Sequence, residues 1–322
     1  MYILKSTTKN ELNKVQIAIK KELASEKIIQ DIYEYIFNAE GKKTRGLLSL
    51  LASKSSGGAL RNRIDLASII ELLHTATLVH DDVVDDSELR RGTKSVNQVW
   101  TNSYSVLMGD FIYSKAFILM VKLGIPSILD ELAKATNDIA RGEIIQLELY
   151  EKKELIKLED LLKVSYLKTG RLFEASAKTG AMLAKKSKEE IQSFGLLGKA
   201  LGIAFQIQDD ILDYKALKLD TGKPALKDFK EGKITFPLYF ALQDIDVKEK
   251  KFLLAKLGKQ KITSKDQNKI YQLIHNDQTQ KQINRLIDKY SKETLKHLNR
   301  LKHHACYNEI LNLITYFKER KK

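Results

Sequence analysis

The sequence contains few of the residues that interrupt helices. Its 322 residues include only three prolines and sixteen glycines, and alternation of apolar with polar residues is scarce. Proline and glycine are the strongest local signals for turns, whereas alternation with a period of two is typical of half-buried strands. Their scarcity argues against a strand-rich fold. It favours long, weakly interrupted helices, which a chain of this length can pack around a sizeable core.

Cysteine is nearly absent, and so are long apolar runs. Cys306 is the single cysteine, so an internal disulfide is excluded and a reducing compartment is favoured. Residues 1–5 lack the apolar core of a signal peptide. The apolar stretch 106–129 is interrupted by charged residues such as Asp110, so it falls short of the roughly eighteen apolar residues typical of a membrane span. We expect a cytoplasmic protein without a transmembrane segment.

The chain is strongly basic, with a formal net charge of +14 and dense lysines at 248–261 and 318–322. This balance is typical either of a solvated, lysine-rich surface or of a protein that attracts nucleic acid, membranes or phosphorylated substrates. The sequence lacks aromatic–basic interleaving and zinc-finger spacing, which disfavours nucleic acid. It also lacks the glycine-rich loops that cradle phosphates, so phosphate binding must use another device.

The most informative feature is a pair of aspartate clusters separated by more than a hundred residues. Asp81-Asp82-Val83-Val84-Asp85 and Asp209-Asp210-Ile211-Leu212-Asp213 each follow an apolar, helix-like run. Residues four apart share a helix face, and like charges there destabilise a helix by about 0.2–0.5 kcal/mol per pair. Such faces require a cation, and carboxylate oxygens suit hard divalent ions. The clusters therefore predict Mg²⁺ ions that grip a polyphosphate. The register of the first cluster stays ambiguous, since Asp82 and Asp86 are also four apart.

The apolar periodicity predicts an all-α fold without repeats. The expected helices cover about 10–40, 45–54, 62–86, 95–103, 105–123, 126–150, 159–184, 188–215, 233–244, 247–257, 264–277 and 279–320. Because no linker or shift in composition divides the chain, we expect residues 1–322 to form one domain. Its architecture should be a helical bundle with a central cavity, closed at the top by both aspartate clusters.

Basic and polar residues accompany the clusters. They are Lys42, Arg45, His74, Arg90, Arg91, Lys168, Thr169, Gln206, Lys223 and Lys233. Each alone has an ordinary structural interpretation: a solvated lysine, a core histidine, or an arginine paired with a neighbouring acid. Together they fit one chemistry, in which Mg²⁺ and cationic side chains make diphosphate a leaving group. The surrounding apolar helices would shelter a carbocation from water.

The combined pattern resembles the trans-isoprenyl diphosphate synthase family, and within it the octaprenyl and heptaprenyl diphosphate synthases. The resemblance runs from about residue 38 to the basic tail. Residues 74–85 and 202–213 are similar to the first and second aspartate-rich motifs. Further matches are Met108-Gly109-Asp110-Phe111, Gly142-Glu143-Ile144-Ile145-Gln146-Leu147 and Glu231-Gly232-Lys233-Ile234-Thr235-Phe236-Pro237-Leu238. The isoprenoid synthase type of helical bundle and a homodimer are implied by this resemblance.

The resemblance also implies residue roles in a head-to-tail condensation of isopentenyl diphosphate onto an allylic diphosphate. Mg²⁺ would bridge the allylic diphosphate to Asp81, Asp85 and Asp209, supported by Asp82, Asp210 and Asp213. Contacts to the allylic diphosphate would come from Arg90, Lys168, Lys223 and Lys233. The cation would lie near Thr169 and Gln206. Isopentenyl diphosphate would bind without metal through Lys42, Arg45, His74 and Arg91.

Two departures from the family pattern stand out. Gly46 occupies a position where the family usually has proline, which is favoured near helix starts. We therefore expect a looser turn there, with its cations retained. In the basic loop 222–233 that follows the second cluster, here called the lysine loop, Ala225-Leu226 replaces a glycine, so we expect this loop to differ in shape and to keep its charge.

Product length is predicted from two small residues before the first cluster. In short-chain members of the family, bulky aromatics four or five residues upstream of the first aspartate close the product channel. Thr77 and Ala76 occupy those positions here, so a growing chain can pass. We expect a medium or long polyprenyl product such as a quinone side-chain precursor. The alternatives are a farnesyl or geranylgeranyl diphosphate synthase, a terpene cyclase or head-to-head synthase, a non-catalytic subunit, and a nucleic-acid-binding protein.

Overall fold

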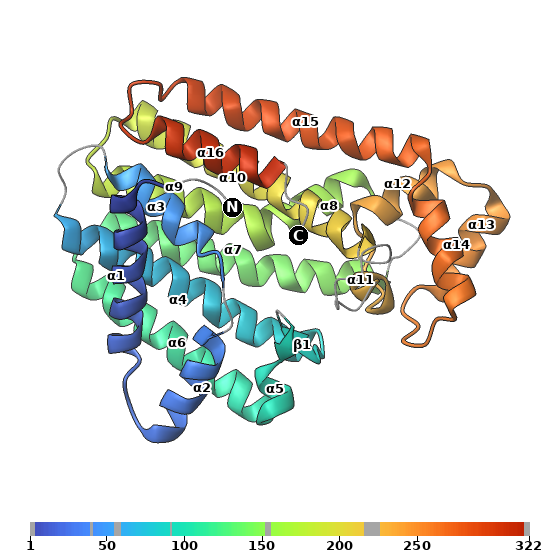
Figure 1. The fold of residues 1–322 in the computed structure, drawn as a ribbon, viewed down its shortest axis with the longest axis horizontal. Coiled ribbons are helices and arrows are strands. Elements are labelled where there is room, and N and C mark those ends of the chain that lie inside the picture. Colours follow the sequence, from blue (N-terminus) through green and yellow to red (C-terminus); the bar gives the residue numbers. More distant parts are fainter. Residues whose placement is uncertain are drawn as a thin grey trace. The chain divides into compact units, whose positions relative to one another are not determined.

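The computed structural model describes residues 4–38, 41–54, 59–90, 92–151, 156–215 and 226–318 (Figure 1). These ranges are almost entirely helical, which confirms the all-α prediction. The larger helices are α1 (Ser6–Glu22), α2 (Lys27–Asn38), α3 (Thr44–Ser53), α4 (Leu60–Val84), α6 (Asn102–Leu123), α7 (Pro126–Glu151), α9 (Arg171–Leu183), α10 (Lys188–Lys215), α15 (Asp277–Asn299) and α16 (Tyr307–Lys318). The shorter ones are α5 (Val96–Val99), α8 (Leu158–Ser165), α11 (Lys227–Lys230), α12 (Phe236–Asp244), α13 (Val247–Lys256) and α14 (Ser264–Ile274).

The chain divides into two compact units. The first comprises Met1–Asn137, Leu172–Gly198 and His297–Leu313, and the second comprises Asp138–Arg171, Lys199–Lys296 and Ile314–Lys322. The first aspartate cluster belongs to the first unit and the second cluster to the second unit.

The first unit is organised around α4. This helix packs against α6, α3 and α1. Its middle is buried almost without interruption from Leu66 to Leu73, because apolar residues occupy several faces of the helix. A helix that is apolar all round is expected at the centre of a core. The acidic end of α4 emerges from this core at Asp81, so the buried part of the helix holds the cluster in place.

The segment expected as one helix over 10–40 forms two helices in the structure. α1 ends at Glu22 and α2 begins at Lys27. Val15 and Ile19 of α1 are buried, and so are Ile32 and Tyr33 of α2. The break lets both helices turn an apolar face to the core. Ser25, whose hydroxyl donates to Glu26, is the only residue in the break with a preference for turns.

The second unit has two apolar clusters. One surrounds Tyr214 and Phe229 and includes residues of α12, α13 and α14. The other joins Ile203 and Ile207 of α10 to Phe236 and Ile283. Between α8 and α9 the helix passes through a π-helical turn, η2 (Tyr166–Gly170). Such turns are rare and are frequent at functional sites. The uninterrupted α-helix expected over 159–184 is therefore interrupted at Lys168 and Thr169.

The helix expected over 279–320 is also divided. α15 ends at Asn299, and a series of turns leads to α16 at Tyr307. Leu301, His304 and Cys306 in the turns are each less than 4% exposed. The chain leaves the helix without any glycine or proline because burial of these side chains stabilises the turn.

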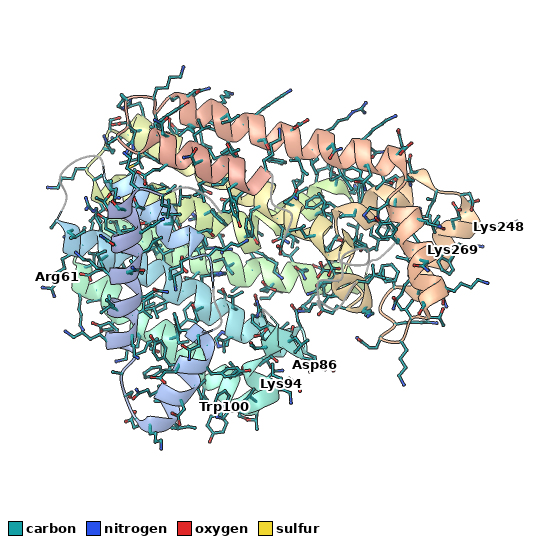
Figure 2. All side chains as sticks on the ribbon, viewed as in Figure 1. Arg61, Asp86, Lys94, Trp100, Lys248 and Lys269 are labelled. Atoms are coloured by element: carbon teal, nitrogen blue, oxygen red, sulfur yellow. The ribbon has the colours of Figure 1, made fainter. Side chains whose placement is uncertain are left out.

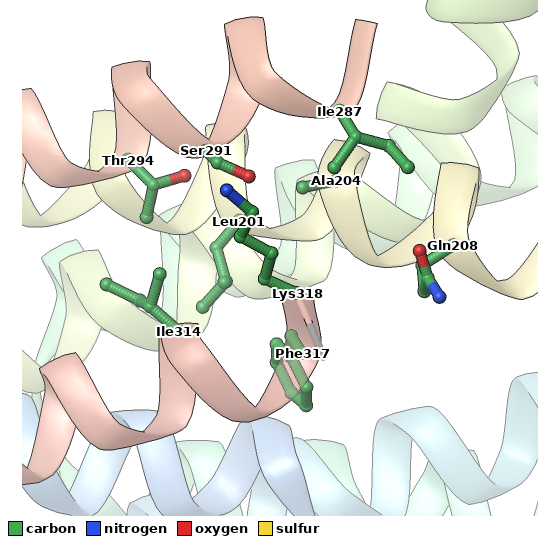
Figure 3. A pocket seen from close by; sticks show the side chains of 9 residues that line it. All are labelled: Leu201, Ala204, Gln208, Ile287, Ser291, Thr294, Ile314, Phe317 and Lys318. Carbon is green, nitrogen blue, oxygen red and sulfur yellow. The ribbon is translucent and has the colours of Figure 1, made fainter. Parts of the chain in front are cut away.

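A pocket in the second unit lies among α10, α15 and α16 (Figure 3). Its lining includes Leu201, Gln208, Ser291 and Phe317. The cavity volume is about 10 Å³, roughly the space of one water molecule. This pocket is too small for a prenyl chain, and the central cavity stays a prediction.

Lysine is frequent in α13, α14 and their connection. Lys248 and Lys269 project from these helices (Figure 2), and both side chains are exposed. Lys269 also lies over the ring of Phe252, 4.5 Å from its centroid. Among the described residues, no helix is both long enough and apolar enough to cross a membrane.

Candidate active site

The first aspartate cluster occupies the last turn of α4. The backbone N–H of Asp85 donates to the carbonyl oxygen of Asp81 at 2.8 Å. The two residues therefore stay in helical register, as the spacing predicts. Both side chains are half-buried. They are the members of the cluster suited to hold a cation at the surface.

Asp82 has a different environment from its neighbours. It is 3% exposed, and its carboxylate forms an ion pair with the guanidinium of Arg90. Arg90 Nε donates to both oxygens, at 2.8 and 3.0 Å, and Nη2 lies 2.6 Å from Oδ1. Charge-assisted bonds of this bidentate kind are strong and directional. Asp82 thus anchors Arg90, and this arrangement favours the register in which Asp81 and Asp85 are the accessible pair.

Arg90 is presented by a small hairpin that follows α4. Strand β1 (Leu89–Arg90) pairs antiparallel with β2 (Thr93–Lys94). Gly92 has a φ of 84° in the turn, a conformation that glycine adopts without strain. The arginine predicted beside Arg90, Arg91, lies outside the described residues.

His80 fastens the acidic end of α4 to α6. Its Nε2 lies 3.1 Å from the carbonyl oxygen of Val106 and 3.4 Å from Asp110 Oδ1. The ring presses against Gly109, where an added Cβ would lie 2.2 Å from Nε2. The segment from Met108 to Phe111, noted only as a motif, thus has a physical purpose. Gly109 lets the ring of the residue next to Asp81 approach the backbone of α6.

Two of the residues predicted for isopentenyl diphosphate, Arg45 and His74, meet at the start of α3. Arg45 Nη1 lies 3.0 Å from His74 Nε2, and the guanidinium stacks 4.6 Å from the ring centroid of Phe173. Lys42 is exposed just before the helix. The expectation that Gly46 leaves this turn loose is not met, because its backbone N–H donates to Glu71 Oε1 at 2.7 Å.

The second cluster repeats the division of labour seen in the first. Asp209 is exposed, whereas Asp210 is 5% exposed. Asp210 accepts from Gln206 Nε2 at 2.7 Å and from the backbone N–H of Phe236 at 3.3 Å. Burial raises the pKa of Asp210 well above its usual range, and nearby Asp228 raises it further. In each cluster the first aspartate is accessible and the second is buried and anchored.

Asp213 is joined to the loop that follows α10. Its two oxygens accept from the backbone N–H groups of Lys227 and Asp228, each at 3.1 Å. Burial raises the pKa of Asp213 to about 8, and the neighbouring Asp228 contributes. Burial also raises the pKa of Asp228, while Lys233 opposes the shift. Burial and the neighbouring carboxylates thus disfavour the charged forms of both acids, an effect that a bound cation would oppose.

Lys168 and Thr169 occupy the π-helical turn η2. Lys168 Nζ lies 2.6 Å from Glu143 Oε2 on α7. The approach requires Gly142, where a Cβ would meet Leu167 Cβ at 2.7 Å. Thr169 Oγ1 donates to Gln206 Oε1 at 2.7 Å. Thr169, Gln206 and Asp210 therefore form a continuous chain of hydrogen bonds, and the role predicted for Thr169 and Gln206 beside the allylic cation stays a prediction.

The lysine loop is described only in its second half. Lys233 Nζ lies 2.7 Å from Glu231 Oε2, and Lys227 lies 3.5 Å from the other oxygen of the same carboxylate. Lys223 lies outside the described residues, and so does Ala225, the first residue of the departure from the family pattern. Leu226, the second residue of that departure, has a φ of 58° and precedes α11. This left-handed conformation strains Leu226, and it occurs close to the position where the family pattern has glycine.

Whether the carboxylates of a cluster can hold a divalent cation depends on the number of ligands that they offer. Among the described residues, no group of three or more acidic, histidine or cysteine side chains is placed to enclose an ion. Mg²⁺ usually binds through one or two carboxylates together with water and substrate phosphates. Paired carboxylates such as Asp81 with Asp85 match this habit. The donor set fits Mg²⁺ when a phosphorylated substrate supplies the remaining oxygens.

The all-α fold and the two aspartate clusters, each with an accessible and an anchored carboxylate, are the features predicted for the class of all-α prenyltransferases. The family model described as polyprenyl synthetase matches residues 26–274, which include both clusters. The chain belongs to the polyprenyl synthetase family, which confirms the resemblance seen in the sequence. Within this family it is a medium- or long-chain trans-polyprenyl diphosphate synthase.

Named relatives agree with this placement. The chain is 40% identical to the octaprenyl diphosphate synthase of Escherichia coli over 236 residues, 73% of each protein. A decaprenyl diphosphate synthase structure from Rhodobacter capsulatus superposes with a TM-score of 0.90 at 31% identity, covering 98% of both chains. A Caulobacter crescentus polyprenyl synthase, in complex with calcium and isoprenyl diphosphate, gives a TM-score of 0.91 at 31% identity, covering 98% of this chain and 96% of that one.

Several residues that build the site were not identified from the sequence. Asp228 lies beside Asp213, Glu143 pairs with Lys168, and Glu71 caps the start of α3. His80 and Gly109 form the contact between α4 and α6. The glycines were a usable signal, because a glycine inside a helical pattern indicates close packing. The acids gave no such signal, since their partners lie far away in the sequence.

Proposed function

We propose that the protein elongates an allylic diphosphate with isopentenyl diphosphate in a Mg²⁺-dependent reaction that yields a product of heptaprenyl or octaprenyl length. The observation that carries the proposal is the repeated pattern of one accessible and one anchored aspartate in both clusters, within a family match that spans them. The small residues Ala76 and Thr77 support the long product rather than the short-chain alternative. A quinone side chain is the destination that we propose for that product.

The accessible carboxylates act on the leaving group. Asp81, Asp85 and Asp209 would hold Mg²⁺, which when bound neutralises the diphosphate and assists its departure. Asp82 holds Arg90 in its extended position, and Glu143 similarly orients Lys168. Both cations would add to the charge around the departing diphosphate. Asp210 and Asp213 fix the geometry of the second cluster, with a supporting role at the cation.

The hydrogen-bonded pair Thr169 and Gln206 would stabilise the allylic cation through oxygen dipoles. Thr169 Oγ1 donates its proton to Gln206, so its lone pairs remain available to a positive centre. The isopentenyl double bond then attacks this centre. A proton is lost from the new chain to the departing diphosphate, which leaves a trans double bond. Lys42, Arg45, His74 and Arg91 would bind isopentenyl diphosphate without metal.

A homodimer is part of the proposal. The side chains of Leu107, Ile118 and Val121 on α6 are 65%, 47% and 68% exposed. Exposed apolar side chains gathered on one helix are typical of an interface, and a two-fold interface between copies is the commonest arrangement. A single domain over residues 1–322 and a cytoplasmic location complete the proposal. The single cysteine, Cys306, is buried and supports a reducing compartment.

The direct test is to incubate the purified protein with Mg²⁺, farnesyl diphosphate and labelled isopentenyl diphosphate, and to measure the length of the dephosphorylated product. We expect a heptaprenyl or octaprenyl chain, and no incorporation when EDTA replaces Mg²⁺. Asp81→Asn and Asp209→Asn should each reduce kcat by about 10²–10³-fold. Asp130→Asn is the matched control, because Asp130 is an exposed carboxylate that pairs with Lys134 one helical turn away. Absence of elongation by the unaltered protein would refute the proposal.

A further inference from the structure

The start of α3 is capped from a neighbouring helix rather than by its own residues. Its N-cap residue, Lys43, has a φ of 45° and makes no side-chain capping bond. The first N–H groups of a helix need acceptors from elsewhere. Glu71 on α4 supplies one, since its Oε1 accepts from the N–H of Gly46 at 2.7 Å. Glu71 is 5% exposed, so this bond is shielded from competing water.

Gly46 is required for this capping bond. A Cβ at this position would lie 2.8 Å from Glu71 Cγ and 3.2 Å from the carbonyl oxygen of Ala67. Proline, the residue usual in the family, has no N–H to donate. Proline would restrict the turn through its fixed φ, whereas this chain restricts it through a hydrogen bond to α4. Gly46 and Glu71 therefore form one device for fixing the turn.

The device adjoins the residues proposed for isopentenyl diphosphate. Arg45 immediately precedes Gly46, and its Nη1 lies 3.0 Å from His74 Nε2. His74 follows Glu71 by three residues, so both lie on the same face of α4. Two neighbouring links thus join the start of α3 to α4, one through the backbone of Gly46 and one through the side chain of Arg45.

We infer that Glu71 is a positioning residue for isopentenyl diphosphate, acting through the backbone of Gly46 to fix Arg45 against His74. This rests on the proposed function, which assigns Arg45 and His74 to that substrate. Glu71 itself needs no contact with the substrate. Its carboxylate also lies at the positive end of α3, where negative charge is favourable.

The test measures binding without turnover. Isothermal titration calorimetry with isopentenyl diphosphate, in the absence of Mg²⁺ and of an allylic partner, gives its Kd. A separate titration with farnesyl diphosphate and Mg²⁺ gives the affinity of the other substrate. Glu71→Ala should raise the Kd for isopentenyl diphosphate about tenfold and leave that for farnesyl diphosphate within twofold. Glu71→Gln should stay within twofold for both, because the amide oxygen still accepts the Gly46 N–H.

Two further variants separate positioning from general destabilisation. Glu131→Ala removes another buried carboxylate of the first unit, which pairs with Lys178 at 2.6 Å, and it should leave both Kd values unchanged. The double variant Gly46→Pro/Glu71→Ala removes donor and acceptor together and restores the proline restraint. It should bind isopentenyl diphosphate more tightly than Glu71→Ala alone, within about threefold of the unaltered protein.

Several outcomes would overturn the inference. An unchanged Kd in Glu71→Ala would do so, and so would equal losses for both substrates. If Glu71→Gln were as weak as Glu71→Ala, or the double variant no better than the single one, the hydrogen bond would not be the cause. Failure of the proposed function looks different, because the unaltered protein would then bind neither diphosphate, or Arg45→Gln would leave the Kd for isopentenyl diphosphate unchanged.

Discussion

Arg90 holds Asp82 in a bidentate ion pair, with Nε 2.8 and 3.0 Å from the two carboxylate oxygens. Asp82 directly follows Asp81 in the chain, and Asp81 is the residue predicted to meet the cation. An arginine expected from sequence to touch substrate thus has a structural partner in the protein itself. The two roles are compatible, since a guanidinium has five N–H groups and the Arg90 side chain remains 29% exposed.

Removal of Arg90 should therefore cost stability as well as activity. Arg90→Met leaves the buried Asp82 carboxylate without its cation, which we expect to lower the free energy of unfolding by on the order of 3 kcal/mol. The additional change Asp82→Leu should recover part of this loss, because no buried charge remains. Urea denaturation followed by circular dichroism measures both effects.

Arg61→Met is the control for this prediction. Arg61 is 91% exposed and pairs with Asp65 at 3.8 Å, so its loss should change stability by less than about 0.5 kcal/mol. If Arg90→Met kept full stability and lost only affinity for the allylic diphosphate, the anchoring role of Asp82 would be wrong.

Gly109 should tolerate no side chain while His80 is present. In Gly109→Ala the new methyl group would lie 2.2 Å from His80 Nε2, so the ring must leave its place between α4 and α6. We expect a loss of about 1–3 kcal/mol of stability. Because Asp81 follows His80 directly, a higher Mg²⁺ concentration for half-maximal activity should accompany this loss.

A second substitution provides the check on this contact. Gly109→Ala combined with His80→Ser removes the clash and should recover most of the stability measured by thermal unfolding. Gly195→Ala is the control, since a Cβ there meets only flexible side chains at 3.6 Å or more. Equal destabilisation by Gly195→Ala and Gly109→Ala would contradict a specific role for the His80 contact.

The sequence was sufficient to place the two clusters and several of the long helices, because these depend on local periodicity. The helix expected over 188–215 occurs with those bounds, and the one expected over 45–54 differs by one residue at each end. It was insufficient where distant packing decides. The turns at 300–306 contain no glycine or proline, and they depend on the burial of residues such as Leu301.

The candidate site shows the same boundary. The aspartates were recognisable from their spacing, and the cations from a family pattern. Which carboxylates are accessible was not, because it depends on contacts between segments far apart in sequence. Asp210, for example, is buried and accepts a hydrogen bond from the backbone N–H of Phe236, which lies twenty-six residues later in the chain. The spacing pairs Asp209 with Asp213 but does not show the exposure of any carboxylate, whereas in the structure Asp209 is exposed and Asp210 is buried.

His304 should make the first unit less stable in mild acid. Burial lowers the pKa of His304 to about 4, helped by nearby Lys186, although Glu190 opposes the shift. Between about pH 6.5 and pH 4 the unfolded chain binds a proton at this residue that the folded chain does not. Stability therefore falls as the pH is lowered through this window, and is insensitive to this residue above it.

Thermal unfolding between pH 4.5 and 7.5 measures this dependence. His304→Gln retains an acceptor for the N–H of Cys306, which His304 Nδ1 accepts at 3.2 Å, but cannot bind a proton. Its melting temperature should fall less between pH 6.5 and 5 than that of the unaltered protein. His303→Gln removes an exposed neighbour whose Nε2 lies 2.9 Å from Glu190 Oε1, and it should leave most of the original slope in place. Parallel slopes for all three proteins would refute the assignment.

Product length should respond to Thr77 more cleanly than to Ala76. Thr77 lies one turn before Asp81 on the same face and is half-buried, whereas Ala76 is fully buried. Thr77→Phe therefore places its ring in space on the cluster face and should shorten the product to farnesyl or geranylgeranyl length, with little loss of stability. Ala76→Tyr should also shorten the product, but its side chain must displace packed neighbours at a cost of about 1–3 kcal/mol. Chromatography of dephosphorylated products, beside thermal unfolding of each variant, separates the two effects. Thr77→Ser, which stays small, should keep the long product, and full-length product from a folded Thr77→Phe variant would show that the growing chain does not pass this face of α4.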